Sequence, residues 1–298
     1  MERYLSSADF IASLQQGRFL VVGRAGMDLY PEPTGTRITE ALSFVADLGG
    51  SAGNIAVAIA RHGKAACLVS VLSDDAVGQF VASKLSQYGV ATDHLHFTDE
   101  PMTRSSLAIA ESRPNDADVV IYRNNSSDMR LSQAHVSQID FDGVAAVVLT
   151  GTALSDSPSD RALAAITKAA RQADKPVILD VDYRASAWPS PSVAAERTLN
   201  FARNCDIVVG NDEEFALLAK STDSSGADGF ALAREMAVRG QIVLYKQGSE
   251  GCRLLLGDSV QQFGIFPIEL AKPFGSGDAF LGTFLARLQD GLSLEAAI

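Results

Sequence analysis

Short apolar runs and longer amphipathic segments alternate along most of this chain, and this alternation limits its fold more than any other feature. The apolar runs are rich in β-branched residues, as is typical of buried strands, and the amphipathic segments often end at glycine. Expected strands cover 18–23, 65–72, 143–151, 176–182, 205–211 and 241–248, and expected helices cover 53–63, 75–89, 159–173, 192–204, 211–220, 228–240 and a segment from 277 onward. Strands that alternate with such helices predict an α/β fold with a doubly wound, mainly parallel sheet.

Two regions break this alternation. Residues 30–47 and 98–124 carry segments such as "SSLAIAESR" and "DVVIYRNN", in which apolar and polar residues alternate and no helix intervenes. A period of two is typical of antiparallel strands with one solvent-exposed face, which predicts a small sheet beside the main one. No linker is long enough to separate independent domains, so residues 1–298 are interpreted as one domain.

Composition argues against two classes of partner. The net charge of −11 disfavours a nucleic-acid surface, which needs clustered Lys and Arg. The first residues lack the basic-then-apolar layout of a signal peptide, and no apolar run approaches the roughly 20 residues that a membrane helix needs. The 3 cysteines are well separated and lack CxxC spacing, so they indicate reduced thiols and predict a cytoplasmic protein.

Polar and glycine residues follow strand after strand of the expected sheet. A doubly wound sheet binds ligands outside the carboxyl ends of its strands, so a site is expected at these positions. They are Asp28, the "LGGSAGN" segment at 48–54, "DVDYR" at 180–184, Asn211 with Glu214 one helical turn later, "QGSEG" at 247–251 and "GSGD" at 275–278. This repetition predicts a single ligand-binding edge.

Asp278 stands at the start of an expected helix, directly after Gly275, Ser276 and Gly277. Glycines allow a backbone to approach an anion closely, and the first N–H groups of a helix point toward such an anion. A carboxylate beside that anion site suits phosphoryl transfer, because the amides hold developing charge and the carboxylate takes the acceptor's proton. The alternative is a plain helix start, with Asp278 at the favourable end of the helix dipole.

The other strand ends also have purely structural interpretations. "LGGSAGN" fits a tight turn, because it lacks the GxGxxG spacing of a dinucleotide site. Asn211 and Glu214 have the spacing of a capping box. Asp180 and Asp182 fit solvated loop acids, with Arg184 as their ion-pair partner. The residues alone leave these alternatives open.

Two longer motifs resemble the signatures of the ribokinase-like (PfkB) carbohydrate kinases. "LGGSAGNIAVAIARHG" resembles the first signature and "PFGSGDAFLGTF" the second, with the NxxE spacing at 211–214 and "KQGSEG" between them in the family's order. The resemblance extends over nearly the whole chain. It implies an ATP-dependent sugar kinase that uses Mg²⁺, with a small β-sheet lid at about 30–47 and 98–124 and a homodimer through that lid. A monovalent cation is a further candidate cofactor.

The resemblance also implies how the sugar is bound. Sugar hydroxyls would contact Asp28, Gly50 and Asn54. A sugar carboxylate would be approached by Arg123 and Arg184, a task that suits the bidentate guanidinium group.

Further roles at the phosphoryl and nucleotide side follow from the same resemblance. Asn211 and Glu214 would organise phosphate and Mg²⁺, with Glu214 acting through water. Three residues would border the nucleotide, namely Lys246, Gly248 and Gly251. The anion hole would consist of Gly275, Ser276 and Gly277, and the catalytic base would be Asp278.

Within the family, kinases of sugar acids are the most similar. "GRAGMDLY", "YRNNSSDM", "DVDYRASAW" and "KPFGSGD" imply phosphorylation of the primary hydroxyl of 5-dehydro-2-deoxy-D-gluconate, an intermediate of inositol catabolism. The alternative substrates are 2-keto-3-deoxygluconate, fructose and ribose. A catalytically silent, sugar-binding regulator is the alternative of a different class, and the retention of Asp278 with both glycines favours the enzyme.

Two features depart from the family's pattern. Lys272 and Pro273 stand where many members have Asp-Thr, so Lys272 either contacts phosphate or stays in solvent. The chain stops at Ile298 inside an expected helical region, where later residues of family members wall the adenine. The C-terminal end is therefore expected to be incomplete.

Overall fold

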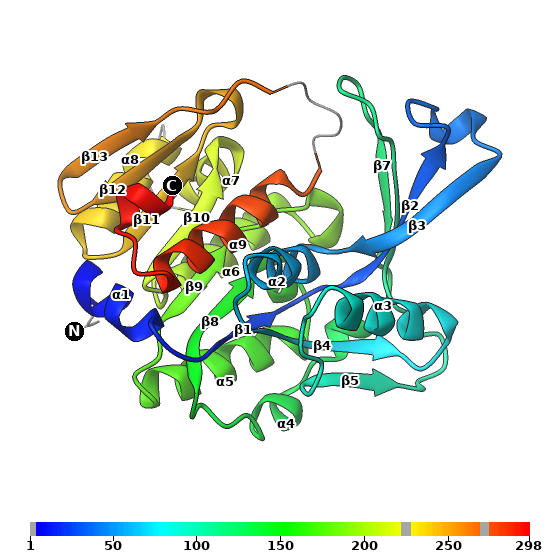
Figure 1. Ribbon diagram of the computed structural model, residues 1–298, viewed down its shortest axis with the longest axis horizontal. Coiled ribbons are helices and arrows are strands. Elements are labelled where there is room, and N and C mark those ends of the chain that lie inside the picture. Colours follow the sequence, from blue (N-terminus) through cyan, green and yellow to red (C-terminus); the bar gives the residue numbers. More distant parts are fainter. Residues whose placement is uncertain (1–3, 222–227, 269–273) are drawn as a thin grey trace.

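The computed structural model describes residues 4–221, 228–268 and 274–298, and its main feature is one large sheet (Figure 1). Within these residues 9 strands pair in the order β13-β12-β11-β10-β9-β8-β1-β4-β5. The pairings from β11 to β5 are parallel, whereas β12 and β13 form an antiparallel edge. The strands are β1 (Arg18–Val22), β4 (Ala66–Ser73), β5 (Leu95–Thr98), β8 (Val144–Thr150), β9 (Val177–Asp180), β10 (Ile207–Asn211), β11 (Ile242–Lys246), β12 (Cys252–Leu256) and β13 (Ser259–Phe263).

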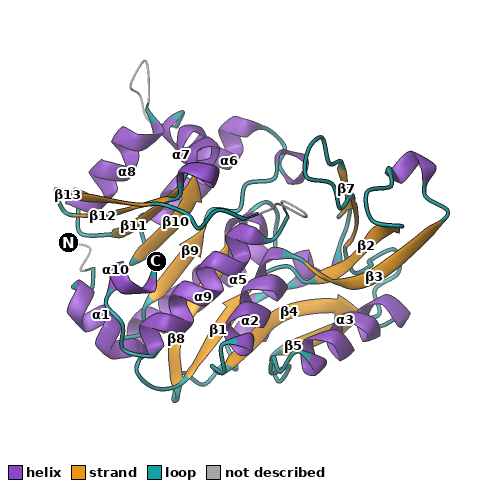
Figure 2. Cartoon of the chain, turned by 45° about the horizontal axis from the view of Figure 1, so that its top comes forward, coloured by secondary structure: helices purple, strands orange, loops and turns teal. Residues whose placement is uncertain are grey.

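Helices cover both faces of this sheet (Figure 2). One buried cluster packs the sheet against α4 (Gln133–Val136), α5 (Ser159–Gln172), α6 (Pro191–Ala202), α7 (Asp212–Ala219) and α8 (Gly229–Val238). The other packs it against α1 (Ser7–Leu14), α2 (Ser51–Arg61), α3 (Ala76–Gln87), α9 (Ser276–Gln289) and α10 (Leu294–Ala297). The predicted doubly wound, mainly parallel sheet is confirmed. None of the helices in the described residues is both long and apolar enough to cross a bilayer.

The sequence patterns missed α1, β5 and the β12–β13 hairpin. Strand β13 reads SVQQF, and its residues are exposed or half-buried, so no apolar pattern marks it. The other two elements are short, with 8 residues in α1 and 4 in β5. Short segments carry too few residues for a clear periodicity.

The strand order reverses beside β1. From β1 the chain continues outward through β4 and β5, and then returns to β8 on the opposite side before it proceeds through β9, β10 and β11. Ligands of doubly wound sheets bind outside the carboxyl ends of the strands at such a switch point. The fold therefore favours a site beyond the ends of β1 and β8.

A small four-stranded sheet projects from the main one (Figure 1), with the order β3-β2-β6-β7. Its strands are β2 (Gly26–Glu32), β3 (Ser43–Gly49), β6 (Leu107–Ala110) and β7 (Val119–Tyr122). The antiparallel expectation holds for β2 with β3 and for β6 with β7, but it is wrong for β2 and β6, which pair in parallel. A long connection joins β2 to β6, and such connections permit parallel pairing where a hairpin does not.

Helices α2 and α9 lie close together. A Cβ atom at Gly282 would lie 2.5 Å from Cβ of Ala58 and 2.7 Å from the carbonyl oxygen of Ile55. Glycine at this position therefore lets the two helix backbones approach each other. Because both helices begin at the same edge of the sheet, their packing fixes the residues of their first turns relative to one another.

Candidate active site

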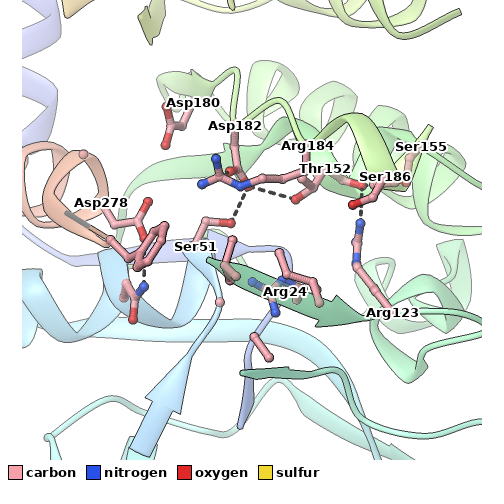
Figure 3. Close-up of a pocket in the computed structure, with 18 of the residues that line it drawn as sticks. Arg24, Ser51, Arg123, Thr152, Ser155, Asp180, Asp182, Arg184, Ser186 and Asp278 are labelled. Carbon is pink, nitrogen blue, oxygen red and sulfur yellow. Dashed lines mark hydrogen bonds and ion pairs between the residues drawn. The ribbon is translucent and has the colours of Figure 1, made fainter. Parts of the chain in front are cut away.

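A cavity of about 900 Å³ lies at the predicted edge, between the carboxyl ends of the main strands and the small sheet (Figure 3). It brings together residues from the first turn of α2, the loops after β1, β8 and β9, the end of β11 and the start of α9. The predicted site residues that line it are Asp28, Gly50, Asn54, Arg123, Arg184, Asn211, Glu214, Lys246, Gly248, Gly275, Ser276, Gly277 and Asp278.

Asp278 lies in the first turn of α9 with 8% of its surface exposed. Its Oδ2 accepts a hydrogen bond of 2.8 Å from Nδ2 of Asn54 on α2. Gly275 is the N-cap of α9 and no side chain caps the helix, so Asp278 is not a capping residue, although it lies in the first turn at the favourable end of the helix dipole. Burial, followed by the nearby charges of Asp182 and Asp180, raises the pKa of Asp278 to about 7.

The glycine loop before Asp278 brings the backbone of α9 to the cavity. Gly275 has a φ of +81°, a left-handed conformation that glycine adopts without strain. A Cβ atom on Gly277 would lie 3.2 Å from Nζ of Lys246, so glycine leaves room there for that ammonium group. The first N–H groups of a helix have no intrahelical acceptor, and here they face the cavity beside a cation. This arrangement suits an anion such as a phosphoryl group.

Lys246 ends β11, and its half-buried side chain contacts Asp180, with Nζ 3.2 Å from Oδ1. Burial disfavours the charged form, but Asp180 and Glu214 outweigh it and raise the pKa of Lys246 above its ordinary value. The ammonium group therefore stays charged at neutral pH. It supplies a fixed positive charge next to the glycine loop.

Asn211 and Glu214 form the capping box that their spacing predicts. Oδ1 of Asn211 accepts from N–H of Glu214 at 2.9 Å, and Oε2 of Glu214 accepts from N–H of Asn211 at 2.7 Å. Oε1 of Glu214 accepts from N–H of Tyr183 at 3.0 Å. The structural interpretation of this pair is confirmed, and the same carboxylate also lines the cavity.

The described residues contain no group of three or more His, Cys, Asp or Glu side chains that could hold a metal ion. Both oxygens of Glu214 already accept backbone hydrogen bonds, so this carboxylate fits a cation held mainly by water and phosphate. Mg²⁺ usually keeps several waters and takes only one or two protein carboxylates. The donor set at this edge is compatible with that ion.

Asp182 connects three elements around the cavity, although the sequence motifs gave it no role in binding or catalysis. Its carboxylate accepts hydrogen bonds from Oγ of Ser51 and from Oγ1 of Thr152, and Arg184 lies 3.2 Å away (Figure 3). Asp182 also has a φ of +39°, which is uncommon for a residue with a side chain. Such strain persists where surrounding contacts hold it, often at functional sites.

Asp180 and Asp182 are buried, so the solvated-acid interpretation is wrong, while the ion pair with Arg184 is confirmed.

The two predicted carboxylate-binding arginines differ in their surroundings. Arg123 donates to Asp128 through Nε and Nη2 and to the carbonyl of Thr152 through Nη1, with 8% of its side chain exposed. The side chain of Arg184 is 53% exposed. Arg123 thus ties the segment after β7 to the segment after β8, whereas Arg184 remains open to the cavity.

The glycines of "LGGSAGN" allow the end of β3 to pack closely against β2 and the loop after β1. A Cβ atom at Gly49 would lie 1.9 Å from Oδ1 of Asp28, and one at Gly50 would lie 2.5 Å from the carbonyl oxygen of Arg24. Gly50 also has a φ of +92°. The tight-turn interpretation therefore holds, and the turn also places Asp28 and Arg24 at the cavity wall.

Two predicted residues are not placed in the cavity. Gly251 is not part of its lining, and its φ of +88° and close approach to the carbonyl oxygen of Phe263 belong to the turn before β12. Lys272 lies outside the described residues. The cavity is also lined by Arg24, Ser51, Thr152 and Asp182, to which the sequence motifs gave no individual role in binding or catalysis.

Comparison with known proteins identifies the family. The model of the pfkB family carbohydrate kinases matches residues 16–298. The chain belongs to this family. It is 38% identical to a 5-dehydro-2-deoxygluconokinase of Photobacterium profundum over 96% of this chain and 88% of that protein. It is 30% identical to a protein of the same name from Clostridium beijerinckii, over 92% and 81% of the two chains.

Solved structures share the fold. A putative ribokinase II of E. coli in complex with ATP and Mg²⁺ has a TM-score of 0.81 at 18% identity, covering 95% of this chain and 89% of that one. A fructokinase of Xylella fastidiosa with bound ATP has a TM-score of 0.78 at 23% identity, covering 92% and 82%. The ribokinase-like fold expected from the motifs is thereby confirmed, and family membership makes the chain a carbohydrate kinase.

The raised pKa of Asp278 predicts the pH dependence of this carbohydrate kinase. Only the ionised carboxylate can accept a proton, so kcat/KM should rise about tenfold per pH unit below a pKa of about 7 and level off above it. Initial rates between pH 5.5 and 9 measure this limb, and the residual activity of Asp278→Asn is the control, because it should lack the limb. A wild-type profile that is flat between pH 5.5 and 7 would contradict the prediction.

Proposed function

We propose that this chain is an ATP-dependent kinase that phosphorylates the primary hydroxyl of 5-dehydro-2-deoxy-D-gluconate. The observation that carries the reaction type is Asp278, a buried carboxylate with a raised pKa at the N-terminus of α9, facing the cavity. The substrate rests on the names of the relatives from Photobacterium profundum and Clostridium beijerinckii. The arginines in the cavity lining support an acid over a neutral sugar.

Asp278 acts as the proton acceptor in the proposed reaction. The hydroxyl oxygen of the sugar acid forms a bond to the γ-phosphorus of ATP, while the bond between that phosphorus and the bridging oxygen of ADP breaks. The hydroxyl proton passes to Asp278, which Asn54 holds in place. Negative charge on the transferring group meets the first N–H groups of α9, at Gly275, Ser276 and Gly277, and the ammonium of Lys246.

The two halves of the cavity are assigned to the two substrates. The sugar acid takes the half lined by Asp28, Gly50, Asn54, Arg123 and Arg184. The phosphates and nucleotide take the half near Asn211, Glu214, Lys246 and Gly248, and Gly251 supports the turn beside it. Glu214 would hold Mg²⁺ through water, and the ion would supply neutralisation of phosphate charge. The monovalent cation remains a prediction.

The small sheet serves as the lid over the sugar. Its side chains alternate between two faces, and the face with Ala108, Ala110, Val119 and Ile121 lines the cavity. An apolar cover excludes water from the reacting groups, which limits hydrolysis of ATP. The lid comprises the strands between residues 26 and 49 and between 107 and 122, somewhat different bounds from those expected from the sequence.

The substitution Asp278→Asn tests the proposed base. Asn keeps the size of the side chain and can still contact Asn54, but it cannot take the proton, so kcat should fall roughly 10²- to 10⁴-fold. The wild type and the variant are assayed by ADP release with 5-dehydro-2-deoxygluconate, 2-keto-3-deoxygluconate, fructose and ribose. Thermal unfolding and sugar-acid binding should stay close to wild type.

Three results would contradict this proposal. A loss of kcat below tenfold would remove Asp278 as the base. Higher kcat/KM of the wild type for fructose or ribose than for either acid would remove the sugar-acid assignment. Binding of the acid without ADP release from any of the four sugars would favour the silent regulator.

The second face of the small sheet supports a homodimer through the lid. Strand register places only apolar side chains on it, and Phe44, Val120 and Tyr122 are 39%, 42% and 58% exposed. Contiguous apolar patches of this kind mark interaction surfaces, and a symmetric dimer covers the same patch on both copies.

Light scattering should give twice the chain mass for the wild type and one chain mass for the double variant Val120→Lys, Tyr122→Lys. A monomeric wild type, or a double variant that stays dimeric, would contradict this interface.

A further inference from the structure

Arg24 differs from the other cations that line the cavity. Within the described residues the cationic side chains of the lining are Arg24, Arg123, Arg130, Arg184 and Lys246. Four of these have a carboxylate within 4 Å, supplied by Asp128, Glu100, Asp182 and Asp180 respectively. Arg24 has no such partner in this part of the chain. Among these five cations, the charge of Arg24 is therefore the one that has no ion-pair partner within the described residues.

The backbone of Arg24 is held firmly at the switch point of the sheet. Arg24 follows β1, and its carbonyl oxygen accepts a hydrogen bond of 3.2 Å from N–H of Gly53 on α2. The close approach of Gly50 to the same carbonyl leaves little room for movement. Since α2 also carries Asn54, which holds Asp278, the position of Arg24 is tied to that of the catalytic base.

The guanidinium group of Arg24 makes one hydrogen bond to the described residues. Nη1 donates to Oγ of Ser106, a neutral hydroxyl, at 3.2 Å. Arg123, in contrast, uses Nε, Nη1 and Nη2 for Asp128 and Thr152. Figure 3 shows Arg24 and Arg123 as separate side chains among the residues that line the cavity. Most N–H donors of the Arg24 guanidinium group therefore remain available to a ligand.

Charge balance indicates what that ligand carries. Although burial opposes its ionisation, Arg123 holds the pKa of Asp128 below its ordinary value, with a smaller contribution from Arg24. Asp128 is thus ionised but already bonded to Arg123 and Ser126. A guanidinium group without an ion-pair partner in a partly buried cavity favours an anion, and a planar carboxylate matches its two parallel donors.

We propose that Arg24 is the principal contact for the carboxylate of the substrate, and that Arg123 is a positioning residue that shapes the wall around it. This inference rests on the proposed sugar-acid substrate. It differs from the prediction of the sequence motifs, which assigned the substrate carboxylate to Arg123 and Arg184. Arg184 remains a second contact from the opposite wall.

The substitution Arg24→Met tests this assignment, with Arg239→Met as the matched control, because Arg239 pairs with Glu235 on the surface of α8. Rates are measured with 5-dehydro-2-deoxygluconate and with its primary amide, which keeps the shape and loses the charge. Arg24→Met should lower kcat/KM for the acid roughly 30- to 1000-fold, mainly through KM, and change the amide by less than about threefold. Arg239→Met should leave both unchanged.

The outcomes separate this inference from the proposed function. A wild type that uses the amide as well as the acid would overturn the sugar-acid substrate itself, and this inference with it. A wild type that prefers the acid, together with an Arg24→Met variant that loses both activities equally or neither, would overturn the role of Arg24 alone. If Arg24→Met does not fold, Arg24→Lys decides. Lysine keeps the positive charge but lacks the paired donors of the guanidinium group, so this variant should raise KM for the acid about tenfold and leave KM for the amide unchanged. Equal KM values of variant and wild type for the acid would overturn the inference.

Discussion

The crowding of buried carboxylates near one ammonium group is the constraint on which the rest of this site depends. In the described part of the chain, Asp180, Asp182, Glu214 and Asp278 are all buried and all lie at the carboxyl edge of the sheet. The positive charge of Lys246 balances part of the negative charge of these carboxylates, and the carboxylates in turn keep Lys246 protonated. Burial, together with the negative charge that is not balanced, raises the pKa of Asp278 into the range where a general base works best at neutral pH.

The fold produces this crowding through strand order and helix packing. Parallel strands end at one edge, so the residues that follow β9 and β11 come within reach of each other. The close contact between α2 and α9 then adds Asn54 and Asp278 from two further elements. A site that needs several carboxylates together is thus assembled from distant segments, and Asn54 and Asp278, which bond to each other, are 224 positions apart in the sequence.

Much of this arrangement could be predicted from the sequence, because periodicity and strand-end residues report directly on the sheet and its binding edge. The ion pairs of the arginines could not be predicted, because no sequence pattern shows which arginine has a carboxylate within reach. Arg24 lies inside the quoted "GRAGMDLY", four residues before Asp28, yet only its surroundings distinguish it from Arg123. The parallel pairing of β2 and β6 and the turn at Gly251 escaped for the same reason, because both depend on contacts distant in sequence.

The most direct test of this account is the carboxyl pKa of Asp278 itself. A ¹³C NMR titration of protein labelled in aspartate carboxyl groups, compared with Asp278→Asn, identifies the resonance of this residue. The account predicts a midpoint of about 7 for the wild type. It also predicts a lower midpoint in Asp182→Asn, because one of the charges that raises it is removed. A wild-type midpoint near the ordinary value of about 4, or one that Asp182→Asn leaves unchanged, would contradict it.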